Sequence, residues 1–474
     1  MKKIIERWYS ASGYKEVLKL AFPLILSTSS TSLQHFVDRM FLTWYSPEAI
    51  AASVPGGILS FTLMCLFIGT AAYVNPFVAQ YYGAKQFDRI APVVWQGIYF
   101  ALVTGVAFFI YIPVAEPIFN LINHEPGVKV LEIQYFKILC FSAPAVFVNA
   151  AVSGFFAGRG QTWTILWVNS SATLLNIIID YILIFGKLGF PELGMQGAAI
   201  ATVIASYFSA ILIFTIMLRS KYRKQFQTWK NKKFDVELFR RLMRFGIPNG
   251  VHFFLDLLGF TLFILLIGRF GTTVLAATNI TFNINSIAFM PMVGLGFAVE
   301  IIVGQKLGEN QPKLARLGTY SALHITFLYM GVIALTYVLL PKLYLMPFAA
   351  QADPVYFAQV RKISIILLQF VAFYSIFDTM NIIFSNSLRG AGDTRFVMFT
   401  AVILSWIIMI IPTYLGSVVY KWSFYWTWAF LTGYIVALGV VFYFRFLGGK
   451  WESMRVIEEP PVVIPQNLPE SPIG

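Results

Sequence analysis

Charged residues are scarce in this chain of 474 residues, because they make up 12% of it against about 25% in a typical soluble protein, while 58% of its residues are hydrophobic. Apolar stretches of about 20 or more residues recur from end to end, which is the length a helix needs to cross a hydrocarbon layer about 30 Å thick. The sequence therefore predicts an all-α polytopic membrane protein with twelve transmembrane helices. The expected spans cover residues 17–43, 52–79, 93–115, 132–156, 162–185, 194–218, 243–267, 276–304, 316–340, 360–387, 397–419 and 424–446.

Cysteine and catalytic motifs are also nearly missing. Only Cys65 and Cys140 occur, both inside expected spans, which argues against a disulfide framework or a cysteine-based metal site. The sequence shows no nucleophile elbow, no histidine-rich box and no phosphate-binding loop. We therefore expect no enzyme, no ATP-driven pump, and no cofactor or metal beyond a coupling ion, Na⁺ or H⁺.

The positive charge is placed on one side of the expected membrane. The formal net charge is +13, and most of the 35 Lys and Arg residues fall in the tails and in loops that face the same side, with a dense cluster between Arg219 and Arg244. This is the pattern of cytoplasmic loops. It predicts a multi-pass protein of the plasma membrane, the inner membrane in a bacterium, with both termini cytoplasmic. Membrane lipid, and not nucleic acid, is the expected partner of these charges.

The two halves of the chain repeat each other. The run Val-Ala-Gln-Tyr-Tyr-Gly at 78–83 matches Val-Gly-Gln-Lys-Leu-Gly at 303–308, displaced by 225 residues, and 158–162 matches 390–394 at a displacement of 232. Six spans return a chain to its starting side, so the halves share one orientation and are related by a pseudo-two-fold axis along the membrane normal. Repeats of this kind are typical of transporters, in which the substrate path runs between the halves. The expected parts are a cytoplasmic segment (1–16), an N-lobe (17–218), a basic linker (219–242), a C-lobe (243–446) and a disordered cytoplasmic tail (447–474).

Acidic residues inside the spans are candidates for function, because a charge within a bilayer is costly. In the first half, Asn176 and Asp180 are four residues apart and share one helix face, and Asp38 and Thr202 are expected at a similar depth. These four residues are the predicted cation site of the N-lobe, able to provide oxygen ligands for Na⁺ or a carboxylate pair that shares a proton. Interhelical hydrogen bonding alone is an equally good explanation for Asn176 and Thr202.

In the second half, Asp256 and Asp378 lie midway along their spans, and Tyr374 precedes Asp378 by one turn. These three residues are the predicted cation- or substrate-binding set of the C-lobe. His252 precedes Asp256 by one turn, but a lone intramembrane histidine is more often a packed residue than a proton relay. Glu300 is expected near the cytoplasmic end of its span, where a loop contact is at least as good an interpretation as a functional role.

In order along the chain, these residues resemble the MATE (multidrug and toxic compound extrusion) transporters, and most closely their NorM-like bacterial branch. The resemblance covers about residues 15–446. It depends on Val-Asp at 37–38, Ala-Ala at 51–52, Gly-Arg-Gly-Gln-Thr at 158–162, Leu-Gly-Met-Gln-Gly-Ala-Ala-Ile-Ala-Thr at 193–202, Gly-Ile-Pro at 246–248, Phe-Met-Pro-Met-Val-Gly-Leu-Gly at 289–296, Val-Gly-Gln at 303–305 and Leu-Arg-Gly-Ala-Gly-Asp-Thr at 388–394.

The resemblance implies a monomeric secondary transporter that exports amphipathic or cationic small organic compounds in exchange for Na⁺ or H⁺. It also implies ion-binding roles for both predicted acidic sets, so the coupling route stays open. Arg39 is a departure, since a small residue is usual there in the family; it either extends outward or caps Asp38. Pro23 and Pro248 remove a helical hydrogen bond in equivalent spans and indicate either a static kink or a hinge. The alternatives are a flippase for lipid-linked precursors of the same superfold, which would have a basic cavity, and a polytopic membrane enzyme.

Overall fold

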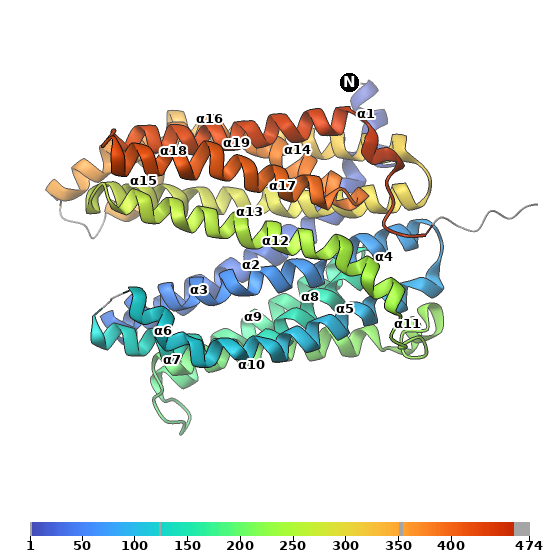
Figure 1. Ribbon diagram of the computed structural model, residues 1–474, viewed down its shortest axis with the longest axis horizontal. Coiled ribbons are helices and arrows are strands. Elements are labelled where there is room, and N and C mark those ends of the chain that lie inside the picture. Colours follow the sequence, from blue (N-terminus) through green and yellow to red (C-terminus); the bar gives the residue numbers. More distant parts are fainter. Residues whose placement is uncertain (1, 123–124, 350–353, 459–474) are drawn as a thin grey trace, which may run out of the picture.

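The protein is a bundle of long helices lying roughly parallel (Figure 1). The computed structural model describes residues 2–122, 125–349 and 354–458, and within these ranges every regular element is a helix. The first half contains α1 (Lys2–Tyr9), α2 (Tyr14–Tyr45), α3 (Pro47–Ala72), α4 (Val74–Gly83), α5 (Phe87–Ala107), η1 (Phe108–Ile110), α6 (Tyr111–Ile122), α7 (Pro126–Cys140), α8 (Ala143–Ala157), α9 (Thr162–Phe185), α10 (Met195–Met217) and α11 (Ser220–Phe226). The second contains α12 (Val236–Gly268), α13 (Thr272–Gly308), α14 (Pro312–Leu339), α15 (Pro341–Ala349), α16 (Pro354–Ala391), α17 (Thr394–Leu404), η2 (Ser405–Ile410), α18 (Ile411–Tyr414), η3 (Leu415–Val419), α19 (Phe424–Leu447) and η4 (Lys450–Ser453).

The expected all-helical membrane fold is confirmed. Ten of the described helical segments are long and apolar enough to cross a membrane, and the pair α7–α8, bent by 46°, passes the same test when taken together. The remaining expected span is α2, which is long enough at 32 residues but carries a polar run that lowers its hydropathy. With α2 the structure has six spans in each half. We call the first six, α2 to α10, the N-lobe, and the last six, α12 to α19, the C-lobe.

The polar run of α2 is satisfied inside its own helix. The hydroxyl groups of this run donate to backbone carbonyls three or four residues earlier, at 2.8–3.4 Å. The donors are Thr28, Ser29, Ser30, Thr31 and Ser32. A hydroxyl bonded in this way leaves no unmade hydrogen bond in a bilayer, so α2 is able to cross the membrane despite its composition.

Prolines explain where two of the spans break. Pro76 has no N–H to donate to Ala72, and the helix is interrupted at Tyr73, between α3 and α4. In the same way Pro144 stands four residues after Cys140, the last residue of α7. The eleventh span contains two π-helical stretches, η2 and η3, on either side of Pro412. Each break changes the direction in which the following side chains point.

The two lobes pack with the symmetry that the repeat predicts. Across the boundary, α12 packs on α3 and α2 packs on α13, which are equivalent pairs under the repeat, and α4 packs on α13 near the axis itself. Within the N-lobe α9 packs on α2 and α10, and within the C-lobe α16 packs on α13 and α19. In Figure 1 the N-lobe occupies the lower half of the view and the C-lobe the upper half.

We call the end of the bundle that holds α11 and residues 450–458 the tail end, and the opposite end, with α6 and α15, the distal end (Figure 1). At the tail end the lobes meet along a seam made of residues 73–83 and 298–308. Gln80 Nε2 donates to the Gly390 carbonyl at 2.9 Å, and its repeat equivalent Gln305 donates to the Gly158 carbonyl at 2.8 Å. A Cβ added to Gly83 would collide with the Gln305 carbonyl, and one added to Gly308 would collide with the Gln80 carbonyl. The seam is thus a closed, pseudo-symmetric contact between backbones.

Part of the expected disordered tail lies on this seam. Trp451 is fully buried and stacks on Phe446, and the backbone N–H of Val456 donates to Gln80 Oε1 at 2.8 Å. For residues 447–458 the prediction of disorder is therefore wrong, because the segment buries apolar side chains and bonds to the seam. Residues 459–474 lie outside the described residues.

Glu458 joins elements of both lobes. Its carboxylate accepts a hydrogen bond from the Tyr81 hydroxyl at 2.7 Å and forms ion pairs with Arg89 at 3.2 Å and Arg241 at 2.5 Å. Burial by itself raises the pKa of Glu458, but the Tyr81 hydroxyl and the guanidinium groups of Arg241 and Arg89 hold that pKa below its ordinary value. The carboxylate therefore stays charged, and bridges the lobes, throughout the neutral range.

Replacing Gly83 with alanine is expected to destabilise the protein by about 1–3 kcal/mol, because the new methyl group meets a backbone carbonyl that belongs to the other lobe. Gly331→Ala is the matched control, since Gly331 lies inside α14 with open space around it. That change should raise stability by roughly 0.5–1 kcal/mol through helix propensity. Thermal unfolding of the purified protein measures both. If Gly83→Ala leaves the melting temperature unchanged or raises it, as expected for the control, the close packing of the seam is contradicted.

Glu458→Gln is expected to lower stability by about 1 kcal/mol at neutral pH, since the ion pairs are partly exposed. Because folding lowers this pKa, the stabilisation is present above the ordinary glutamate pKa of about 4.3 and disappears as the pH falls through the folded-state value. The wild type and the variant should therefore converge in acid. Thermal unfolding at several pH values tests this, with Glu125→Gln, an exposed acid at the distal end, as the control. An equal effect of the control would refute the bridging role.

Candidate functional site

A cavity of about 530 Å³ lies inside the N-lobe. Its lining comes from α2, α3, α7, α8, α9 and α10, and on α2 it extends from Thr31 to Leu42. This places it in the distal half of that helix, away from the seam. All of these helices belong to the N-lobe, so this space lies within one lobe. A path between the lobes stays a prediction.

Three of the four predicted N-lobe residues meet at one point beside this cavity. With its amide nitrogen turned toward the carboxyl groups, Asn176 reaches Asp38 Oδ1 at 3.0 Å and Asp180 Oδ2 at 3.2 Å. One amide nitrogen thus lies within 3.2 Å of an oxygen of each acid, and Asp180 Oδ1 has no hydrogen-bond partner within the described residues. Two carboxylates held this close in a low dielectric repel each other, which favours a proton or a cation such as Na⁺ between them.

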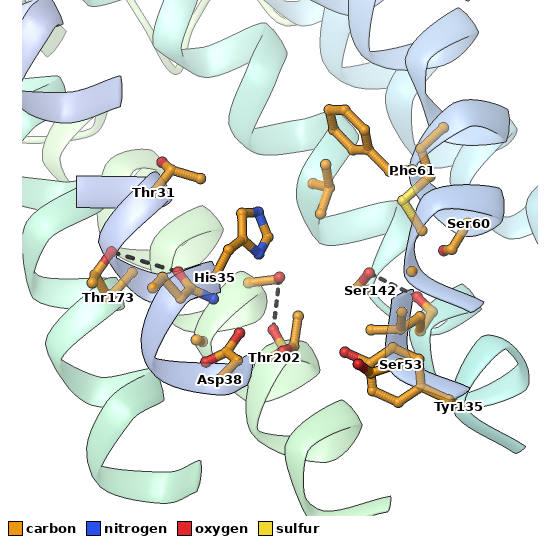
Figure 2. A pocket seen from close by; sticks show the side chains of 18 of the residues that line it. Thr31, His35, Asp38, Ser53, Ser60, Phe61, Tyr135, Ser142, Thr173 and Thr202 are labelled. Atoms are coloured by element: carbon orange, nitrogen blue, oxygen red, sulfur yellow. Dashed lines mark hydrogen bonds between the residues drawn. The ribbon is translucent and has the colours of Figure 1, made fainter. Parts of the chain in front are cut away.

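The two acids differ in how deeply they are buried. Asp180 and Asn176 are fully buried on α9, whereas Asp38 on α2 is 8% exposed and lines the cavity. Thr202 on α10 lines the same cavity, and its carbonyl accepts from Ser206 at 2.8 Å. Figure 2 shows Asp38 and Thr202 on the cavity wall with His35 and Thr173. Asp38 therefore connects the cavity with Asn176 and Asp180, which are buried behind its wall.

Arg39 does not cap Asp38. It lines the cavity, it is exposed, and within the described part of the chain its guanidinium has no hydrogen bond or ion pair. Gln34, a neighbour that sequence reasoning did not single out, lies 3.1 Å from the Asn176 amide. It occurs one turn before Asp38 on α2, which is the spacing that would have indicated it.

The C-lobe acids are held differently. Asp378 Oδ1 accepts from Asn381 at 3.1 Å, and Asp256 Oδ1 accepts from the Tyr434 hydroxyl at 3.5 Å. The two carboxyl groups interact electrostatically, and within the described residues they are not hydrogen-bonded to each other. Tyr374 is 3% exposed and lies within electrostatic range of Asp378. Each acid therefore has its own hydrogen-bond donor, and neither donor was predicted: Tyr434 is on α19, which carried no motif.

A second, small cavity of about 10 Å³ lies beside Asp256. His252, Ser405 and Tyr434 also line it, and the Nδ1 of His252 has no partner within the described residues. A space of this size holds about one water molecule. The spacing of His252 and Asp256 predicted a shared helix face, and the structure places both on this cavity.

Glu300 lies near the tail end of its span, but its hydrogen bond is to the other lobe and not to a loop. It is 8% exposed on the seam, where Oε1 accepts from Asn75 Nδ2 at 2.9 Å. Asn75 and Glu300 are 225 residues apart, so they are equivalent positions of the repeat and face each other across the axis. The repeat offset contained this information, but sequence reasoning did not apply it to this pair.

The predicted hinge residues lie inside continuous helices. Pro23 falls within α2 and Pro248 within α12, and both are buried. Next to Pro248, the Asn249 amide donates to the Gly69 carbonyl on α3 at 2.8 Å, which ties the start of the C-lobe to the N-lobe. Bending at these prolines stays a prediction.

Comparison with known proteins connects this geometry to a family. The MatE family model matches residues 23–182 and 248–415. The chain is 27% identical over 397 residues to the probable multidrug resistance protein NorM of Pasteurella multocida, covering 83% of this chain and 84% of that one. It is 24% identical over 449 residues to the probable NorM of Thermotoga maritima, covering 94% of each.

Solved structures agree on the fold. The chain matches the eukaryotic MATE transporter AtDTX14 with a TM-score of 0.82 at 18% identity, over 92% of this chain and 96% of that one. It matches an outward-facing multidrug resistance MATE transporter of the MOP superfamily with a TM-score of 0.83 at 18% identity, over 94% and 99%. The matched ranges include both lobes and all the predicted acids. The chain therefore belongs to the MatE family, whose members are transporters and not enzymes.

Proposed function

We propose that this protein is a secondary active multidrug efflux transporter that exports amphipathic or cationic organic compounds by antiport with Na⁺ or H⁺. The supporting observation is that the Asn176 amide bridges the carboxyl groups of Asp38 and Asp180 beside a cavity of about 530 Å³. Binding a proton or a cation there changes the charge of the cavity wall. A solute and an ion that compete for the same wall cannot leave together, which is the requirement for exchange.

The seam supports rocking of the two lobes as the mechanism. At the tail end the lobes are joined by the Gln80 and Gln305 hydrogen bonds, while the cavity lies in the distal half of α2. Opening the tail end must break both bonds together, because they are equivalent under the pseudo-two-fold axis. The expected alternation then moves one rigid lobe against the other around this seam.

The orientation of the bundle follows from its charge. The tail end carries the basic segment between Arg219 and Arg244, and by the positive-inside rule we place it, with both termini, in the cytoplasm of a plasma-membrane protein. The cavity then lies in the outer half of the membrane. A single chain provides both lobes and both acidic sets, so we expect a monomer to be sufficient, with membrane lipid and small organic substrates as its partners.

Removing the charge of the site acids is expected to abolish ion-driven efflux. In vesicles containing the purified protein, Asp38→Asn should reduce efflux of a cationic dye to the level of protein-free vesicles, because a neutral amide cannot alternate its charge. Asp256→Asn and Asp378→Asn test the C-lobe set in the same assay. A pH gradient alone and then a Na⁺ gradient alone identify the ion.

Glu48→Gln is the control, since Glu48 is an exposed acid in the first turn of α3 and outside the cavity lining. It should leave efflux unchanged. If Asp38→Asn and both C-lobe variants each transport like wild type under either gradient, the assignment of the coupling site is wrong. If wild-type vesicles themselves show no ion-driven efflux, antiport is wrong.

A further inference from the structure

The walls of the N-lobe cavity differ in chemistry. On one side α2, α9 and α10 present hydroxyl, amide and charged groups, among them His35, Asp38 and Thr202. On the other side α3 presents mainly apolar side chains, including Ile58, Phe61 and Met64. Figure 2 shows Phe61 across the cavity from His35 and Asp38. A solute that fits both walls must be amphipathic, with its polar group directed toward α2.

The acid on the cavity wall already has a partner in the protein. Asp38 Oδ1 lies 3.0 Å from the Asn176 amide nitrogen, which also reaches Asp180 Oδ2 at 3.2 Å. Asn176 and Asp180 are fully buried behind the wall. The Asn176 amide thus contacts one oxygen of each acid.

The positive charge of the cavity has no partner in the protein. Arg39 lines the cavity and is close enough to interact electrostatically with His35, Asp38 and Tyr135, which line it too. Within residues 6–120, 125–349 and 354–458 no side chain forms a hydrogen bond or ion pair with its guanidinium, and none is found for the His35 ring. A guanidinium presents several donors in a planar fork that fits a carboxylate. Its donors face a space large enough for an organic solute.

We propose that the cavity takes amphipathic solutes that carry a carboxylate, acidic or zwitterionic, with Arg39 as the specificity-determining residue that binds the carboxylate. This inference rests on the proposed export function and specifies its substrate class. The apolar part of the solute lies on the α3 wall around Phe61, and His35 adds a hydrogen-bond donor beside the guanidinium.

Two probes of nearly the same shape test this. Nε-dansyl-lysine is a zwitterion with a free carboxylate, and its methyl ester is a cation; both are fluorescent. Binding to the purified full chain is measured by fluorescence anisotropy. We expect the wild type to bind the acid about tenfold more tightly than the ester, as a charge-assisted pair with arginine provides. Arg39→Gln should remove this preference by weakening binding of the acid, while binding of the ester stays the same or improves. Arg39→Lys should restore part of it.

Arg269→Gln is the matched control, because Arg269 is an exposed arginine that follows α12 at the same end of the bundle and does not line the cavity. It should leave both affinities unchanged. Equal binding of acid and ester by the wild type overturns the inference, and so does an equal loss of both probes in Arg39→Gln. Either result is compatible with the proposed antiport if wild-type vesicles still export a cationic dye under an ion gradient. The role of Arg39 and the antiport function are therefore tested independently.

Discussion

The structure depends on one constraint: in hydrocarbon, a polar group without a partner inside the protein is expensive. This explains why the hydroxyl run of α2 bonds to its own backbone, and why Asp180 is found only together with Asp38 and Asn176. It also explains why Arg39 on α2 lines a cavity. Polar residues occur inside this bundle where the fold provides a hydrogen-bond partner or a cavity.

The repeat imposes its own condition on the seam. Near a pseudo-two-fold axis, equivalent positions face each other, so a residue must be compatible with its own counterpart. Glutamine satisfies this, and Gln80 and Gln305 each bond to the opposite lobe. Glutamate does not, because two facing carboxylates would repel each other in a low dielectric. Asn75 opposite Glu300 avoids that conflict, since an amide donates to the acid. The closest point between the lobes is therefore also where their sequences had to diverge.

The sequence was sufficient for the fold and for part of the site. Hydrophobic runs and the 225-residue offset predicted the helices and the two lobes, and the four-residue spacing of Asn176 and Asp180 predicted their shared face. Contacts between helices were harder, because periodicity along one helix does not say which residue of another helix it meets. Tyr434 beside Asp256 follows only from the packing of α12, α17 and α19. Composition alone also led to a wrong prediction of disorder for the first part of the tail. Trp451 and Val456 are buried against surfaces that exist only after folding.

The lobes are alike in fold but unlike in the treatment of their acids. In the N-lobe two carboxyl groups share the amide of Asn176 beside a cavity, so loss or gain of one proton changes the contacts of both. In the C-lobe Asp256 and Asp378 each keep a separate donor, Tyr434 and Asn381, so one can change its charge without rearranging the other. A binding event at the N-lobe pair must therefore alter α2 and α9 together. Because α2 also packs on α13, such a change is transmitted directly to the other lobe.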